Sequence, residues 1–362
     1  MMRVLINAVN DNTLPRGPDR YLLELLPHLI AQDDLSIDLA YAPWQTAFLE
    51  LKPSVRLHLH CVKPPRRPAP RLLWQATVFP RFANRIAPDV TLLPNSLWTP
   101  GLRSPCIMVG HDFLQFRTPE KFGKTKAALL RWVIRRAVAR ADRVIAVSEF
   151  TARDAVMFAG ARADQVVTIY QGGPEPEPQA IHQQREKKFL FVAKLERSKG
   201  ADTLIRAFRA SSRLRESGFS LHIIGPDGNA SSDLQTLLAK DPRGICRHGF
   251  VSDDALREAY RTCRGFVFPS VAEGFGLVLL EAMARGAPVI AARATSLPEV
   301  VGNAGLLVSP GDTRGLTEAM ERLAFDDALF RKLQAEGFVR LADFRWAETG
   351  ARTARLLREV AA

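Results

Sequence analysis

A chain of 362 residues is longer than one hydrophobic core usually serves, so its length predicts two domains. Hydrophobic residues make up 47% of the chain, charged residues make up 24%, and no apolar run approaches the roughly 20 residues that span a bilayer. This composition is typical of a globular protein rather than a membrane-spanning one, and the net charge of +12 favours anionic partners such as nucleic acid, a membrane surface or phosphorylated ligands.

The chain opens with an apolar run at 4–8 that predicts a first strand, without the core and cleavage site of a signal peptide. The cysteines show none of the paired spacings of a zinc site or a disulfide framework. We therefore expect buried free thiols in a reducing cytoplasm. The four cysteines are Cys61, Cys106, Cys246 and Cys263.

Short apolar or β-branched runs alternate with helical stretches through the first half of the chain. This alternation predicts a parallel sheet covered by helices. The expected strands are 4–8, 37–41, 55–62, 90–93, 107–110, 144–147 and 166–169. The expected helices are 20–30, 72–86, 124–141 and 149–159.

A Gly- and Pro-rich stretch at 171–178 predicts an interdomain linker, after which the alternation restarts. We expect a domain at 1–175 and a second at 176–345, each binding ligands beyond the carboxyl ends of its strands. The second set of expected strands is 189–193, 221–224, 245–250, 266–268 and 289–291. Its expected helices are 202–212, 233–239, 253–262, 277–285 and the mostly helical tail 312–362.

The segment 268–282 carries the densest group of candidate functional residues. A predicted strand ends at its start, and a loop that contains Glu273, Gly274 and Gly276 leads into a helix. The glycines let the backbone approach a ligand, and the N–H groups at a helix start suit a phosphate. Short glycine patterns are weak evidence, so a plain turn with two solvated glutamates, Glu273 and Glu281, is the alternative.

Two lysines lie at the strand-end face of the same domain. Lys194 follows the predicted strand 189–193, and Lys199 precedes Gly200 at the start of the next helix. Two ammonium groups beside helix N-termini suit a diphosphate and its growing negative charge as it leaves. A single lysine would indicate only an exposed surface residue, but the pair favours a phosphate site.

The spacing of Glu273 and Glu281 resembles the E-x7-E element of the family-4 retaining glycosyltransferases, in the form E-G-F-G at 273–276. Lys194 and Lys199 resemble the R-x4-K-G element of that family, with Lys at the position where Arg is commoner. The resemblance implies the GT-B fold, an α/β architecture of two Rossmann-like domains whose parallel sheets face each other across a cleft. Transfer chemistry would occur in that cleft.

The resemblance also implies roles for these residues. Lys199 and Lys194 would stabilise the departing nucleoside diphosphate, Glu273 would hold hydroxyls of the donor sugar, and Glu281 would hold the ribose. The segment 249–251 resembles the one whose backbone meets the nucleotide base. The remaining residues expected at the donor are Gly249, Phe250, Val251, Gly274, Phe275, Gly276 and Leu277.

The first half carries shorter matches to the same family. His111 follows a predicted strand, like the histidine of an H-D element near the transferred sugar, and would donate a hydrogen bond to a sugar hydroxyl. A histidine satisfied in the core is the alternative. Gly17 and Arg20 match a glycine loop that approaches the donor phosphates, although Asp19 replaces the second glycine and would repel a diphosphate.

Two further segments resemble structural parts of the family. Ser148 is expected to begin a helix as its N-cap. The helix 346–362 resembles a tail that crosses back onto the acceptor-binding first domain, with Trp346 packing rather than touching ligand.

Basic residues gather between Arg117 and Arg143, where Glu120 and Asp142 are the acidic ones. One interpretation is that 121–143 attaches to an anionic membrane that carries a lipid-linked acceptor, and the other is a solvated helix face. We expect no nucleic acid partner, because no recognition motif is present. The cationic residues are Lys121, Lys124, Lys126, Arg131, Arg135, Arg136 and Arg140, with a second cluster at Lys63, Arg66, Arg67 and Arg71.

The sequence therefore predicts a retaining hexosyltransferase without cofactor or metal, since no D-x-D element could hold a metal on the diphosphate. We expect transfer of mannose from GDP-mannose, or of another hexose from a UDP-sugar, to a glycan or lipid-linked acceptor of bacterial polysaccharide assembly. The expected location is the cytoplasm, at the inner face of the plasma membrane. The alternatives are a nucleotide-sugar epimerase of the same architecture and a non-catalytic sugar-nucleotide or membrane-binding homologue.

Overall fold

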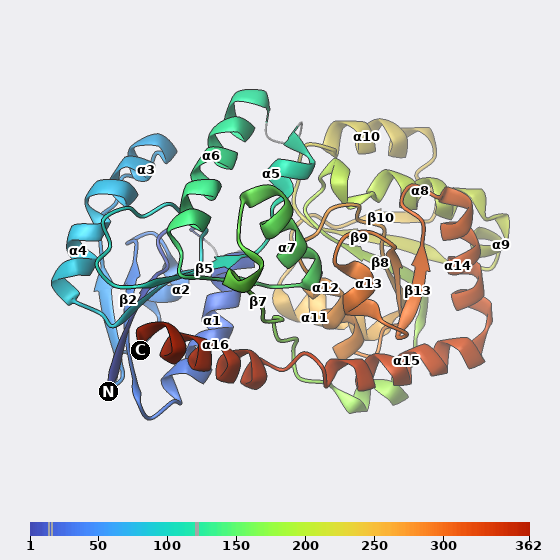
Figure 1. Cartoon of the computed structure of the whole chain (residues 1–362). Coiled ribbons are helices and arrows are strands. Elements are labelled where there is room, and N and C mark those ends of the chain that lie inside the picture. Colours follow the sequence, from blue (N-terminus) through green and yellow to red (C-terminus); the bar gives the residue numbers. More distant parts are fainter. Residues whose placement is uncertain (14, 16, 120–122) are drawn as a thin grey trace. The chain divides into compact units, whose positions relative to one another are not determined.

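The computed structural model describes residues 1–13, 15, 17–119 and 123–362, which form two compact units. Unit 1 consists of Met1–Gly172 and Trp346–Ala362, and unit 2 consists of Gly173–Arg345 (Figure 1). The unit boundary thus lies within the Gly- and Pro-rich stretch, a few residues before the position expected from the sequence. Among the described residues, no helix is both long and apolar enough to cross a membrane.

Unit 1 is built on a seven-stranded parallel sheet in the order β3-β2-β1-β4-β5-β6-β7. Strands such as β4 and β5 are continuous runs of buried residues, which is typical of parallel strands covered on both faces. The strands are β1 (Met2–Asn7), β2 (Leu35–Tyr41), β3 (Leu57–Cys61), β4 (Val90–Leu93), β5 (Cys106–Gly110), β6 (Arg143–Ala146) and β7 (Val166–Thr168).

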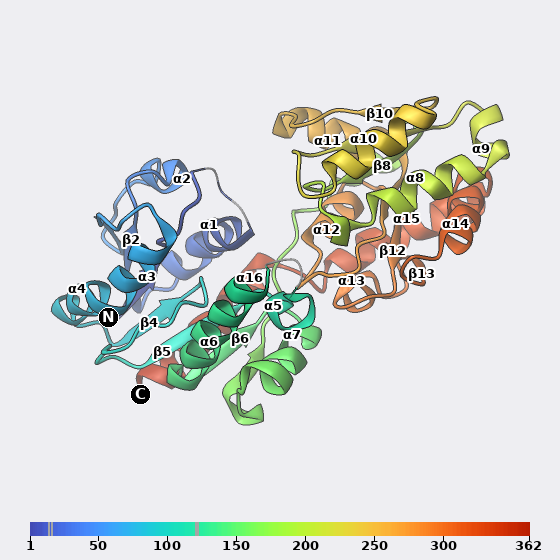
Figure 2. The ribbon, with the colours of Figure 1, turned by 90° about the horizontal axis from the view of Figure 1, so that it is seen from above.

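Helices cover both faces of this first sheet (Figure 1). The helices α1 (Gly17–Ile30) and α16 (Trp346–Ala361) pack together on one face, and α6 (Lys124–Arg140) lies on the other. In the view from above, α6 therefore lies over α16 (Figure 2). The remaining helical segments are α2 (Thr46–Leu49), α3 (Pro68–Thr77), α4 (Phe79–Ile86), α5 (Leu114–Arg117), α7 (Glu149–Asp154), the π-helical turn η2 (Ala155–Ala159) and the turn η3 (Ala163–Gln165).

Unit 2 holds a six-stranded parallel sheet in the order β10-β9-β8-β11-β12-β13. Its strands are β8 (Glu186–Val192), β9 (Ser220–Ile224), β10 (Ile245–Arg247), β11 (Cys263–Phe268), β12 (Val289–Ala292) and β13 (Gly305–Val308). Its helices are α8 (Ala201–Ala210), α9 (Ser212–Glu216), α10 (Ser231–Lys240), α11 (Asp253–Thr262), α12 (Leu277–Ala284), α13 (Leu297–Val301), α14 (Thr313–Phe325) and α15 (Asp327–Leu341). The short turns are η4 (Pro178–His182) and η5 (Arg197–Lys199). Two parallel doubly wound sheets are the architecture that the sequence predicts.

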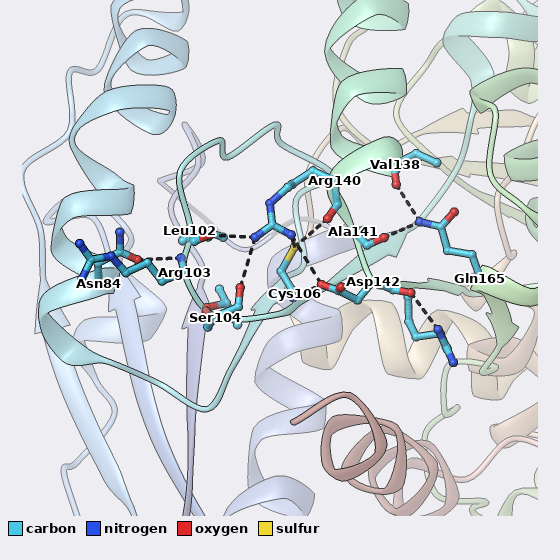
Figure 3. A network of polar contacts seen from close by, with 12 residues as sticks. Asn84, Leu102, Arg103, Ser104, Cys106, Val138, Arg140, Ala141, Asp142 and Gln165 are labelled. Carbon is cyan, nitrogen blue, oxygen red and sulfur yellow. Dashed lines mark hydrogen bonds and ion pairs between the residues drawn. The ribbon is translucent and has the colours of Figure 1, made fainter. Parts of the chain in front are cut away.

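A polar network ties the end of α6 to the start of β5 (Figure 3). Arg140 donates to the Leu102 carbonyl at 2.8 Å, and the carboxylate of Asp142 accepts from the Cys106 N–H at 2.7 Å. Gln165 donates from its buried amide to the carbonyls of the last α6 turn. Arg140 thus holds the fold together and does not belong to the exposed basic surface predicted around it.

Several predicted elements differ from the observed ones. The expected helix 72–86 is two helices, because Pro80 can occupy the first turn of α4 but not the interior of a longer helix. The strand β13 was not predicted, although its residues form a short apolar run. The expectation of four buried thiols is wrong for two, Cys61 and Cys246, which are exposed.

Candidate active site

The loop between β11 and α12 carries Gly274, Phe275 and Gly276 from the predicted donor site. Gly276 caps α12 with a left-handed φ of +107°, and a Cβ atom there would lie 2.7 Å from Leu297 Cδ2. Glycine is the residue that takes this conformation without strain. Helix α12 starts directly afterwards, at Leu277, and the N–H groups of a first turn lack helical partners and suit a phosphate.

Lys199 and Glu273 meet in this loop region. Lys199 Nζ lies 2.7 Å from Glu273 Oε1, and the two side chains are 18% and 14% exposed. The ammonium also lies 6.0 Å from the centre of the Phe268 ring, within cation–π range. The structure therefore joins two residues, 74 positions apart in the chain, that the sequence assigned to the donor sugar and the diphosphate.

Close backbone packing fixes the position of Lys199. The next residue, Gly200, has a φ of +71°, and a Cβ atom on it would lie 2.5 Å from the Pro269 carbonyl oxygen. One residue before Lys199, the Ser198 carbonyl accepts from the Val271 N–H at 2.9 Å. The loop after β8 and the loop after β11 are thus in direct contact, which brings Lys199 to Glu273.

Two hydroxyl residues after β12 support the same loop and were not identified from the sequence. The Thr295 hydroxyl accepts from the Glu273 N–H at 3.2 Å. The fully buried Ser296 hydroxyl donates to the loop carbonyls, 2.9 Å from that of Phe275 and 3.2 Å from that of Glu273. No spacing rule connects a serine to a loop some twenty residues earlier, so the only signal in the sequence was its place after a strand end.

Lys194 lies in the turn after β8 but does not reach Glu273. Its ammonium is 3.5 Å from Glu196 Oε1 and is half exposed. Next to it, Gly225 donates its N–H to the Gly249 carbonyl at 2.8 Å, and a Cβ on Gly225 would lie 1.9 Å from the Ala193 oxygen. The turns after β8, β9 and β10 are therefore packed backbone to backbone.

The predicted base segment follows directly from these turns. Gly249 has a left-handed φ of +43° with open space around its Cα. Phe250 is 79% exposed, and Val251 is half-buried. A large aromatic side chain left in water suits stacking against a flat ligand group.

Glu281 lies one turn into α12 and already has a protein partner. Its Oε2 accepts from the Tyr260 hydroxyl at 3.1 Å. Burial, together with the charge of Glu281, raises the pKa of Tyr260 well above its ordinary value, so that the tyrosine stays a donor. This bond orients the carboxylate, and Tyr260 was not identified from the sequence.

In unit 1, His111 follows β5 and its ring meets the edge of Tyr21 at 5.0 Å between centroids. Burial lowers the pKa of His111 to about 4, and a hydrogen bond to the Pro94 carbonyl opposes this shift. The buried Nε2 has no partner among the described residues, so Nδ1 makes that bond. Nε2 of the neutral ring is therefore a hydrogen-bond acceptor. The expectation from the sequence was that His111 donates a hydrogen bond to a sugar hydroxyl.

The glycine loop is organised differently from the expectation. Gly17 begins α1 with open space at its Cα, and Arg20 is exposed on the same helix. Asp19, however, is buried, and its carboxylate accepts from Asn10 at 2.5 Å and from Asn12 at 2.7 Å. A third amide, that of Gln45, lies 3.3 Å away. The carboxylate is therefore turned into the protein rather than toward solvent.

Among residues 1–13, 15, 17–119 and 123–362, no three His, Cys, Asp or Glu side chains are grouped so that they could hold a metal ion.

Two family models match the chain, one for each unit. "Glycosyltransferase Family 4" matches residues 15–172, and "Glycosyl transferases group 1" matches residues 186–326. Together they span most of the chain.

Curated relatives have related descriptions. A serotype-specific mannosyltransferase, WbdA of Escherichia coli, is 30% identical over 231 residues, which cover 58% of this chain and 28% of WbdA. The O-antigen chain mannosyltransferase B of E. coli is 28% identical over 249 residues, 65% of each chain. The matches thus span between about a quarter and two thirds of these relatives.

Solved structures share the fold over the whole length. Anabaena HepE in complex with UDP-glucose has a TM-score of 0.76 at 20% identity and covers 99% of this chain and 100% of its own. Sucrose-phosphate synthase of Thermosynechococcus elongatus has a TM-score of 0.79 at 20% identity and covers 99% of each chain.

Proposed function

The chain belongs to the family-4 glycosyltransferases, with the family-4 model matching unit 1 and the group 1 glycosyltransferase model matching unit 2, and we propose that it transfers a hexose from a nucleotide sugar to a glycan or lipid-linked acceptor. The observation that carries this proposal is the nearly buried Lys199–Glu273 ion pair, 2.7 Å long, beside the glycine that opens α12. A cation, a carboxylate and the start of a helix lie together there, as a nucleotide sugar requires.

The chemistry follows from what each group can do. The Lys199 ammonium neutralises the charge that grows on the diphosphate as the sugar–oxygen bond breaks, and the first N–H groups of α12 add to it. Glu273 accepts hydrogen bonds from sugar hydroxyls. Its ion pair with Lys199 holds the carboxylate in place. We propose retention at the anomeric carbon, with the leaving phosphate taking the acceptor proton, and no metal or cofactor.

We propose roles for the other predicted residues. Glu281, oriented by Tyr260, would hold the ribose hydroxyls. Phe250 and the backbone of 249–251 would contact the base, and Lys194 would reach the diphosphate from the turn after β8. His111 of unit 1 would accept a sugar hydroxyl through Nε2, which is buried and has no partner among the described residues.

GDP-mannose is the donor that we propose. Support comes from relatives described as mannosyltransferases at about 30% identity. A UDP-sugar is the competing donor, since the similar HepE structure holds UDP-glucose.

The test is nucleotide binding by thermal shift with GDP, UDP, ADP and their sugars, in the wild type and in Lys199→Ala. We expect one nucleotide to raise the melting temperature, and we expect the rise to disappear in the variant. Lys332→Ala, which removes an exposed lysine paired only along its own helix, should keep the rise. Equal responses of both variants would reject the assigned donor site.

Product analysis separates the alternatives. With donor and a glycan extract, a transferase forms a longer glycan and releases nucleoside diphosphate. An epimerase releases nucleotide and an altered sugar without an acceptor, and a non-catalytic homologue binds nucleotide and changes neither.

We further propose peripheral attachment to the inner face of the plasma membrane through the outer surface of α6 and η2. Trp132 on α6 is 46% exposed, Met157 on η2 is 67% exposed, and Leu129 lies with them in solvent. The cations around this apolar surface suit anionic head groups. They are Lys124, Lys126, Arg135 and Arg136.

Two residues of the basic surface predicted from the sequence do not contribute to this proposed membrane-binding surface. Arg117 forms a bidentate pair with the buried Asp154, and Arg140 belongs to the network of Figure 3. Lys121 lies outside the described residues. The surface is therefore smaller than the expected 121–143 segment.

Vesicle sedimentation tests this attachment. The wild type should bind phosphatidylglycerol vesicles better than phosphatidylcholine vesicles, and Trp132→Ser with Arg136→Gln should reduce that binding. Arg314→Gln, an exposed arginine on α14, is the control. Binding that is equal for the two lipids would reject an electrostatic attachment.

A further inference from the structure

Three strand-end loops of unit 1 come together at the carboxyl ends of β1, β2 and β3, around one arginine. Arg66, from the loop after β3, donates to the Thr13 hydroxyl at 3.3 Å in the loop after β1. Its guanidinium also lies 5.8 Å from the centre of the Trp44 ring in the loop after β2. Trp44 in turn donates its indole N–H to the Asn10 carbonyl at 3.0 Å. The arginine is therefore held in place by contacts from both neighbouring loops.

A second arginine braces the first. Arg71 donates to the Arg66 carbonyl at 2.8 Å, and its other terminal nitrogen is 3.4 Å from the Asp11 carboxylate. Arg66 itself contacts a hydroxyl and an aromatic face. It forms no ion pair with a carboxylate in the part of the chain that the structure describes. Arg67 and Lys63 are exposed beside it and likewise form no ion pair among the described residues.

The sequence around this cluster holds no compensating charge. Between Glu50 and Asp89 the chain has no acidic residue. Helix α3 begins at Pro68, directly after Arg67, so its first turn lacks the acidic residue that would match the positive helix end. Arg71 is compensated by Asp11, but Lys63, Arg66 and Arg67 precede the positive end of this helix and repel one another, and a bound anion relieves that repulsion.

The position of the cluster in the fold indicates which substrate carries the anion. In parallel α/β sheets, ligands bind beyond the carboxyl ends of the strands. The cluster lies at that edge of the first sheet, the edge from which His111 also emerges after β5, and it uses none of the unit 2 residues assigned to the donor. The loop after β1 leads to Gly17 and Arg20, which were expected at the donor phosphates, but no cation of the cluster is among the residues assigned to the donor, so an anion bound here is assigned to a second substrate.

We infer that Arg66, Arg67 and Lys63, braced by Arg71, bind a phosphate or diphosphate ester on the acceptor. The guanidinium of Arg66 offers two parallel N–H groups to phosphate oxygens, and the exposed Arg67 and Lys63 add charge. Trp44 offers its free ring edge to the adjoining part of the acceptor. This inference rests on the proposed transferase function, because it assigns the acceptor side of that reaction.

The test is calorimetric titration of the full chain with inorganic pyrophosphate, after saturation with the nucleoside diphosphate that binds the donor site. Because the nucleotide then fills the donor site, pyrophosphate can bind only at other sites. The double variant Arg66→Gln, Arg67→Gln should bind pyrophosphate about tenfold or more weakly, because two charge-assisted contacts are lost. Its nucleotide affinity should remain that of the wild type.

Arg81→Gln with Arg85→Gln is the matched control. Both residues are exposed on α4 of the same unit, and the change in net charge is identical. Pyrophosphate binding should survive in this control. Equal weakening in both double variants would show a general effect of charge and overturn the site, and so would nucleotide-saturated wild type that binds no pyrophosphate.

A bilayer is the other source of phosphate, and vesicles distinguish it. Loss of pyrophosphate binding with retained phosphatidylglycerol vesicle binding supports the acceptor site. Loss of both in the Arg66, Arg67 variant assigns the cluster to the membrane surface and overturns the proposal. If no nucleotide binds the wild type, the transferase function fails instead, and the pyrophosphate comparison is then made with Lys199→Ala as the parent chain.

Discussion

At the scale of single residues, the candidate site depends on hydroxyl groups that touch no ligand. Ser296→Ala removes the buried donor to the Phe275 and Glu273 carbonyls. We expect nucleotide binding to weaken several-fold, because the loop that carries Glu273 loses its anchor. The free energy of unfolding should fall by about 1–3 kcal/mol. Thermal shift and denaturant unfolding measure the two effects.

Ser309→Ala is the control for this prediction, since Ser309 is exposed in unit 2. It should change neither quantity. A Ser296→Ala chain with unchanged nucleotide affinity would mean that the loop holds its shape without this bond.

A second prediction for a single residue concerns His111 and the pH dependence of stability. Its pKa is about 4 in the folded chain, below the ordinary value of 6.5. Between these two pH values the unfolded chain binds the extra proton and the folded chain does not, so stability falls as pH drops from about 6.5 to about 4. The loss amounts to about 3 kcal/mol. At neutral pH the ring is uncharged.

Denaturant unfolding at pH 7.5 and pH 4.5 tests this prediction. His111→Gln should lose less stability over that interval than the wild type, because glutamine does not titrate. His58→Gln, at an exposed position, should behave like the wild type. Identical pH dependence in wild type and His111→Gln would show that the histidine is protonated in the folded chain.

At the scale of elements, β2 carries a charge in the middle of the parallel sheet. Asp38 is fully buried and bonds Arg3 at 2.7 Å and His60 at 2.6 Å. Burial raises its pKa, but these bonds more than offset that effect, so the pKa of Asp38 lies below its ordinary value. Such a carboxylate stabilises the fold at pH values above the pKa that it has in the unfolded chain. This contribution is lost as the pH falls through the lower pKa that it has in the folded chain.

Asp38→Asn should therefore lower the free energy of unfolding at pH 7 by about 1–3 kcal/mol and have a smaller effect near pH 3. Asp33→Asn is the control, because its carboxylate is exposed and pairs with Arg56 at the surface. Denaturant unfolding of the three chains at both pH values measures the effect. An equal loss at the two pH values would assign the effect to packing rather than to charge.

The sequence predicts elements better than it predicts contacts between them. Alternating apolar runs indicate most strands of both sheets, because parallel strands covered on both faces must be continuously apolar. The short apolar run of the edge strand β13 was nevertheless missed, and so was the break between α3 and α4, because the apolar pattern continues across it. Motif spacing identifies Lys199 and Glu273, and their ion pair is a tertiary contact that no spacing encodes. Asp19 shows the same limit, since only its buried amide partners reveal where its carboxylate points.

At the scale of the whole molecule, the last helix returns to the first unit. In α16, the Thr349 hydroxyl donates to the Tyr170 carbonyl at 2.8 Å, and Arg358 pairs with Asp34 at 2.7 Å. Trp346 meets Tyr21 at 5.7 Å between ring centroids, and Tyr21 meets His111. Unit 1 is therefore completed by a helix that follows unit 2 in the chain, and its stability depends on a segment remote in sequence.

Leu357 and Leu323 form a matched pair that tests this dependence. Both are fully buried leucines on a helix, the first on α16 in unit 1 and the second on α14 in unit 2. Leu357→Ala should destabilise by about 2–5 kcal/mol and accelerate hydrogen exchange in β1 and β2 while β8 and β11 stay protected. Leu323→Ala should produce the opposite pattern, read by mass spectrometry of peptides from both units. Exchange that accelerates equally in both units, in either variant, would show that the chain unfolds as one cooperative body rather than as the two units that its packing defines.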